Sequence, residues 1–130
     1  MGKLSAFLKP SPAGRTKKVY LDRFTDEDGK VVPIVVKCIT PEENQAISKK
    51  FKNEDGSLDT GAYGDEMFVE CMVEPDLKDA ELCTYYGTMN PHDVPNRMFT
   101  IGEKQIIQDA IMEINDIKAA NEKLHAAKNS

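Results

Sequence analysis

The sequence predicts an α+β fold, mainly α, in which an N-terminal β-hairpin packs against four or five helices. Two β-branched runs flank an Asp-Gly turn early in the chain, a pattern typical of hairpins. Several later segments place apolar residues three and four positions apart, as amphipathic helices do. Because a lone hairpin is only marginally stable in water, it must pack against these helices.

The chain of 130 residues suits a single domain. Its apolar content of 40% and charged content of 30% are typical of globular proteins. Prolines and a glycine interrupt the first segment, and apolar residues become sparse near the C-terminus. We therefore expect a flexible N-terminal arm at 1–15, one α+β domain at 16–121 and a frayed tail at 122–130.

The predicted hairpin has one strand from Val19 to about residue 24 and a second strand across 31–39. Asp28-Gly29 lies between them, and Gly29 can adopt the positive φ that such a turn requires. Pro33 cannot donate a hydrogen bond to a neighbouring strand, so it indicates a sheet edge or the start of a strand.

Capping patterns predict where the helices begin. Thr40-Pro41-Glu42-Glu43 forms a capping box that opens a helix to about Phe51, and Thr100-Ile101-Gly102-Glu103 opens the longest helix, about 102–121.

Between these two helices, apolar spacing predicts a helix over 62–73 that Pro75 ends. A third helix is expected to take Asp76 as its N-cap and Gly87 as its C′ residue, and a helical turn is expected near 96–99.

Charge is unevenly distributed along the chain. Residues 1–23 carry six cations and only Asp22 as an anion, a net +5, which leaves −10 for the rest of the total of −5. An acidic body disfavours nucleic-acid binding, because phosphate contacts need clustered cations. The basic head either contacts an acidic partner or is a solvated tail.

The cysteine count indicates a reducing compartment. Cys38, Cys71 and Cys83 are odd in number and far apart, which disfavours a secreted disulfide framework. No apolar run approaches the length of a membrane span. We therefore expect a cytoplasmic protein without a membrane partner.

The sequence contains no arrangement typical of catalysis or metal binding. His92 and Cys83 could supply at most two zinc ligands, and no nucleophile motif or glycine-rich phosphate loop is present. We therefore expect no enzyme activity, no catalytic residue, no metal site and no cofactor.

Methionine is abundant in the predicted folded region, at Met67, Met72, Met89, Met98 and Met112. Methionine adapts to varied apolar shapes and suits grooves that bind amphipathic helices. The same residues could simply fill the core between helices, and the sequence leaves both interpretations open.

Besides the hairpin, five segments follow one another along the chain: Leu4-Ser5-Ala6-Phe7-Leu8, Thr40-Pro41-Glu42-Glu43, Val73-Glu74-Pro75-Asp76-Leu77, Glu81 to Gly87, and Gly102-Glu103. In this order, and over about residues 4–117, the chain resembles the XkdN-like tail assembly chaperones of phages and phage-derived elements of Gram-positive bacteria. The resemblance implies a role in building phage tails, as a protein that binds the tape measure protein and keeps it soluble until the tube closes around it.

The hypothesis for the partner-binding surface combines the face of the 62–73 helix, the isoleucine stripe of the last helix and the N-terminal segment as a lid. Its residues are Leu4, Phe7, Leu8, Met67, Phe68, Met72, Ile106, Ile107, Ile111 and Ile114. Some of these side chains must also build the core. A structural tail or baseplate component is the alternative function, and a homo-oligomer is left open.

Overall fold

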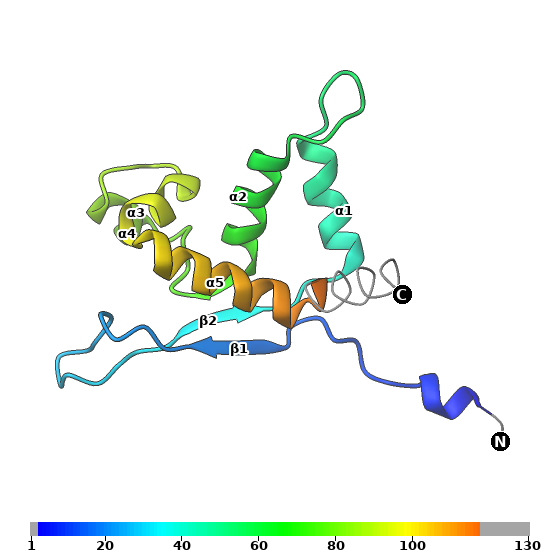
Figure 1. Ribbon diagram of the computed structural model, residues 1–130, viewed down its shortest axis with the longest axis horizontal. Helices are drawn as coiled ribbons and strands as arrows, with labels where there is room; N and C mark the ends of the chain where they lie inside the picture. The colour runs from blue at the N-terminus through cyan, green and yellow to red at the C-terminus, as the bar shows by residue number, and fades with distance from the viewer. Residues whose placement is uncertain (1–2, 118–130) are drawn as a thin grey trace, which may run out of the picture.

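The computed structural model describes residues 3–117, which form a small antiparallel sheet and five α-helices (Figure 1). The strands are β1 (Thr16–Val19), β2 (Ile34–Lys37) and β3 (Met72–Glu74), in the order β1-β2-β3. Helix α5 (Ile101–Ile114) lies across one face of this sheet, and α1 (Pro41–Lys50) and α2 (Thr60–Cys71) rise from it. The predicted α+β class, mainly α, is confirmed.

The hairpin pairs β1 with β2, but its strands are shorter than predicted. The register runs from Thr16 opposite Lys37 to Val19 opposite Ile34. Residues 20–33 instead form a long connection, held by an isolated bridge between Thr25 and Val31. The turn at its tip does place Gly29 at a positive φ of 79°, as the Asp-Gly pattern predicts.

The third strand was not predicted, because apolar helical spacing continues to Val73. The chain leaves helix α2 after Cys71, and β3 pairs with β2, Met72 opposite Val36. A residue before proline is disfavoured in helical conformation, and Pro75 follows directly. Pairing with the open edge of β2 therefore overrides the local helical pattern.

Both predicted capping boxes are confirmed. The Glu43 and Glu103 amides donate to the hydroxyls of Thr40 and Thr100, each at 3.1 Å. Helix α5 breaks at Asn115, earlier than predicted, and residues 118–121 of the predicted helix lie outside the described residues.

The predicted N-cap of the third helix is wrong. Helix α3 (Ala80–Tyr85) begins at Asp79, whose carboxylate accepts from the Leu82 amide at 3.1 Å. Asp76 lies one turn too early to reach that amide, and it accepts from the Lys78 amide instead. The C′ prediction is confirmed, because Gly87 follows the helix with a φ of 71°.

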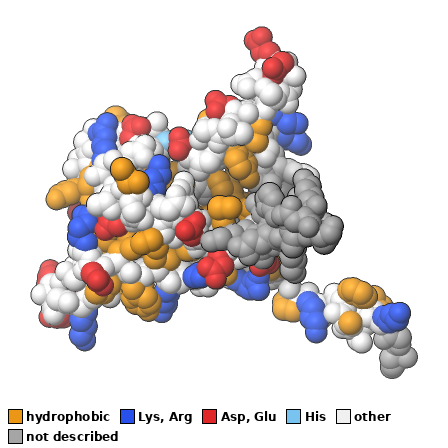
Figure 2. Space-filling model, viewed as in Figure 1, with side chains coloured by type: hydrophobic (Ala, Val, Ile, Leu, Met, Phe, Trp, Pro, Cys, Tyr) orange, Lys and Arg blue, Asp and Glu red, His pale blue; other side chains and the backbone are white. Residues whose placement is uncertain are grey.

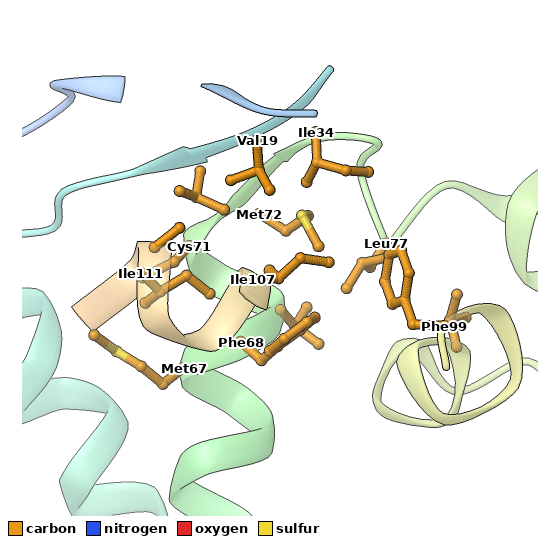
Figure 3. Close-up of a cluster of buried hydrophobic side chains, with 14 of the residues drawn as sticks. Val19, Ile34, Met67, Phe68, Cys71, Met72, Leu77, Phe99, Ile107 and Ile111 are labelled. Carbon is orange, nitrogen blue, oxygen red and sulfur yellow. The ribbon is translucent and has the colours of Figure 1, made fainter. Parts of the chain in front are cut away.

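A short 3₁₀ helix, η2 (Pro91–Asp93), leads into α4 (Val94–Met98), close to the predicted turn at 96–99. The core lies between the sheet, α2, α4 and α5 (Figure 3). Ile107 is fully buried at its centre, beside Phe68 and Met72. This packing holds α2 and α5 side by side.

The N-terminal segment extends away from the body (Figure 1). It carries a short 3₁₀ helix, η1 (Leu4–Phe7), and residues 3–12 are all exposed. The chain rejoins the domain at Gly14 and Arg15, which exchange backbone hydrogen bonds with Cys38 of the β2 end. We refer to residues 3–12 as the arm.

Candidate functional site

An apolar groove separates α2 from α5 and has a volume of about 330 Å³. We call it the α2–α5 groove, and it is lined by Tyr63, Gly64, Met67, Phe68, Gln105, Gln108, Ile111, Met112 and Ile117. Within each helix, the side chains that face the groove are three or four residues apart in sequence, so they lie on one face of that helix.

A second hollow, of about 200 Å³, continues the groove toward the start of α1. The two hollows share Tyr63, Met67 and Ile117. The hydroxyl of Tyr63 hydrogen-bonds the side-chain oxygen of Asn44 on α1, and burial raises the pKa of this hydroxyl. Figure 2 shows apolar side chains gathered in the hollow between α1, α2 and α5.

No charged side chain is among the groove-lining residues of the described chain. The polar groups are the Tyr63 hydroxyl and the amides of Gln105 and Gln108, and Gln105 donates to Asp109 at 2.9 Å. An uncharged lining of this kind suits apolar side chains with a few polar neighbours. It offers no pair of titratable groups for acid–base chemistry.

On α2, the structure places Met67 and Phe68 in the groove. Their exposed fractions are only 8% and 3%, so they form its floor rather than its rim. Met72 lies beyond the end of α2, in β3, and its side chain is buried in the core.

On α5, the four predicted isoleucines have different environments. Ile111 lines the groove, whereas Ile107 is fully buried in the core. Ile114 is half-buried against the core, and Ile106 is 50% exposed without lining the groove. The groove therefore brings together three of the predicted residues, two from α2 and one from α5.

The arm residues of the hypothesis lie apart from this groove. Leu4, Phe7 and Leu8 are between 67% and 77% exposed on the arm, and none of them lines it. Each of these large apolar side chains is thus free to contact another molecule.

Sequence reasoning did not assign six groove residues to the partner-binding surface: Tyr63, Gly64, Gln105, Gln108, Met112 and Ile117. Tyr63 precedes Met67 by four positions, and Gln108 precedes Met112 by four, so helical spacing could have indicated both. Glutamine carries no apolar signal, and the facing of α2 and α5 depends on tertiary packing.

His92 and the three cysteines lie outside the α2–α5 groove. His92 contacts Glu66 through Nε2 and Oε2 at 2.9 Å, which joins η2 to α2. The three cysteines are free and buried, and burial raises the pKa of Cys71 to about 11, so its thiol is a poor nucleophile. Within residues 3–117, no group of three or more His, Cys, Asp or Glu side chains could hold a metal ion.

Helices long and apolar enough to cross a membrane are not found in the part of the chain that the structure describes.

Comparison with known families gives a match over almost the whole chain. The family described as "Phage XkdN-like tail assembly chaperone protein, TAC" matches residues 4–128. The Bacillus subtilis phage-like element PBSX protein XkdN is 31% identical over 109 residues, which are 76% of this chain and 74% of XkdN.

A second relative is the uncharacterized protein YqbN of Bacillus subtilis. It is 34% identical over 88 residues, which are 62% of this chain and 59% of YqbN. The matched region thus spans less than two thirds of the length of YqbN. The crystal structure of YqbN superposes with a TM-score of 0.67 at 30% identity, over 78% of this chain and 86% of that chain.

Proposed function

Because the chain belongs to the family of phage XkdN-like tail assembly chaperone proteins, we propose that it binds the tape measure protein and keeps it soluble during tail assembly. Tail assembly in a bacterial host places this work in the host cytoplasm. The role is one of protein binding and requires no catalysis. A tape measure protein is long and helical, and its apolar stretches need cover until the tail tube encloses them.

The α2–α5 groove is the observation that carries the proposal. Its floor is apolar, and its described lining includes no charge. A helix that lays an apolar face into such a groove is a recurrent mode of peptide recognition. Met67 and Met112 supply flexible side chains that can adapt to different client helices.

The exposed apolar side chains of the arm support the same role as a second contact. Leu4, Phe7 and Leu8 bury little surface, so a client that covers them would remove further apolar surface from water. The seven residues from Lys9 to Arg15 can span up to about 25 Å when extended. We propose that the arm uses this length to contact a client held in the groove.

Binding to the tape measure protein tests the proposal. Met112→Glu places a charge in the half-buried lining of the groove, and we expect the affinity to fall at least ~10-fold, since burying an unpaired charge is costly. Met89→Glu is the matched control, because Met89 is 98% exposed on the α3–η2 connection. Circular dichroism establishes that both variants fold.

Unchanged affinity in a folded Met112→Glu variant would remove the groove from the proposal. Purified tails give an independent test, because a chaperone leaves the particle and a structural component stays. Finding this chain at fixed stoichiometry in finished tails would favour the alternative, a tail or baseplate component.

A further inference from the structure

A second groove lies beside α3 and shares no lining residue with the α2–α5 groove. It has a volume of about 460 Å³ and is lined by Glu74, Pro75, Asp76, Asp79, Glu81, Leu82 and Tyr85. We call it the α3 groove. Tyr85 is 80% exposed and Leu82 is half-buried, so the groove combines apolar surface with acidic groups.

The carboxylates of the α3 groove form no ion pair within residues 3–117. The neighbouring Lys78 donates to Glu70 of α2 at 2.6 Å and does not line the groove. Asp76 and Asp79 accept backbone N–H groups, and Lys78 also interacts electrostatically with Asp76. Among the described residues, Glu74 and Glu81 are the groove carboxylates that have neither kind of contact.

The arm has the complementary chemistry. Its exposed apolar side chains stand beside Lys3 and Lys9, and no acidic residue occurs in the first fifteen positions. Figure 2 shows apolar and basic side chains together on the arm. A segment of this kind can place apolar side chains against Leu82 and Tyr85 while its lysines approach the carboxylates.

The arm and the α3 groove of one molecule lie at opposite ends of its longest axis (Figure 1). In this arrangement the arm does not occupy the α3 groove of its own copy, so both are open to a second copy. We infer that residues 3–9 of one copy dock in the α3 groove of a second copy. This inference does not depend on the proposed client.

The contact joins two different surfaces, so it is heterologous. Each copy that offers its arm still has a vacant α3 groove, and association can continue copy by copy. Because the contact combines charge with apolar burial, salt should weaken it without abolishing it. A chain of linked copies would bind a long partner with higher avidity than separate copies.

Two double variants test the contact, one altered in the arm and the other in the α3 groove. Phe7→Asp with Leu8→Asp removes the apolar arm, and Glu81→Lys with Tyr85→Ser alters the groove without touching the caps of α3. Tyr20→Ser, at a tyrosine that is 62% exposed elsewhere, is the matched control. Circular dichroism establishes folding of each purified protein.

Sedimentation velocity across a concentration series measures how far each protein associates. We expect the unaltered chain and Tyr20→Ser to form dimers and larger species, and each double variant alone to be monomeric. An equimolar mixture of the two double variants should form dimers and nothing larger, because each retains one working half.

Three outcomes overturn the inference. They are an unaltered chain that stays monomeric at millimolar concentration in low salt, a folded double variant that associates like the unaltered chain, and a mixture that stays monomeric. Client binding is tested by Met112→Glu in the other groove, so failure of either proposal can be recognised separately.

Discussion

At the residue scale, two adjacent isoleucines of α5 separate core from surface. Ile107 is fully buried, whereas its neighbour Ile106 is 50% exposed. Both were predicted as contact residues because both belong to the wide apolar stripe of the helix. The stripe is wider than the face that the core can cover, so one edge of it remains in water.

Alanine substitution should separate the two residues. Ile107→Ala leaves a cavity in the core, and we expect it to lower the free energy of unfolding by ~2–5 kcal/mol. Ile106→Ala is the matched control and should cost less than ~1 kcal/mol. Urea denaturation measures both, and equal losses would show that the core is packed differently.

Arg23 joins the β1–β2 connection to the start of α5. Its guanidinium donates to Glu103 at 2.7 Å and 3.1 Å and to the Met98 carbonyl at 2.6 Å. The hydrogen bond from Arg23 is the largest cause that lowers the Glu103 pKa, from its ordinary value of 4.5 to about 2. The ionised carboxylate is therefore favoured in the folded state.

Because of this shift, part of the free energy of unfolding depends on pH in the acidic range. A carboxyl with a lowered folded-state pKa stabilises the protein above its unfolded value, near 4.5, and that contribution is lost as pH falls toward about 2. We expect Arg23→Met to lower the free energy of unfolding at neutral pH and to flatten its decline between those values.

Arg97→Met is the control for this pH dependence. Arg97 donates to the carbonyls of Tyr86 and Gly87 and forms no ion pair with a carboxylate of the described residues. Its loss should lower stability by a similar amount at every acidic pH. Urea melts between pH 2 and pH 7 measure both variants, and an unchanged acid slope in Arg23→Met would contradict the pairing.

At the element scale, local signals were sufficient for the helix starts and insufficient for the sheet. A capping box depends on residues within one turn, so Thr40 and Thr100 could be assigned from the sequence. Strand β3 depends on β2, which lies more than thirty residues earlier, and its own three residues continue a helical pattern. Asp76 and Asp79 are equally good caps, and only the backbone path decides between them.

The end of α5 is attached to the sheet by one side chain. The Asn115 side-chain oxygen accepts from the Ile39 amide at 3.0 Å, and its nitrogen donates to the carbonyls of Lys37 and Ile111 at 3.3 Å and 2.8 Å. These bonds join the C-terminal end of the helix to the segment after β2. Asn115 also lines the second hollow beside the groove.

We expect Asn115→Ala to lower the free energy of unfolding by ~1–3 kcal/mol, because it leaves partly buried backbone groups unpaired. Asn96→Ala is the matched control, since Asn96 is exposed and its side chain accepts a hydrogen bond from Lys104 at 2.7 Å. Amide hydrogen exchange at Ile39 should accelerate in the first variant alone. Unchanged exchange there would mean that the bond to Asn115 contributes little.

At the scale of the whole molecule, the class of the protein was predictable, and the shape of its binding surface was not. The absence of catalytic motifs and the order in which recognisable segments follow one another, from Leu4 to Glu103, indicated the family that the comparison shows. The groove could not be predicted, because it depends on how closely α2 and α5 pack. Met67 and Ile111 both line it, whereas Met72 and Ile107 are buried in the core.

The arm is part of the molecule but is not expected to contribute to the stability of the fold. Leu4, Phe7 and Leu8 bury little surface, and the chain first bonds to the domain at Gly14. Deletion of residues 1–9 should therefore leave the melting temperature within ~2 °C, since only a loss near 1 kcal/mol would shift it by several degrees. Val36→Ala, at a fully buried position of β2, is the contrast and should lower the melting temperature by at least ~4 °C.

Differential scanning calorimetry at low protein concentration keeps self-association out of the comparison. A large drop on deletion would mean that the arm packs on its own domain in solution, and both contacts proposed for it would then have to compete with that packing.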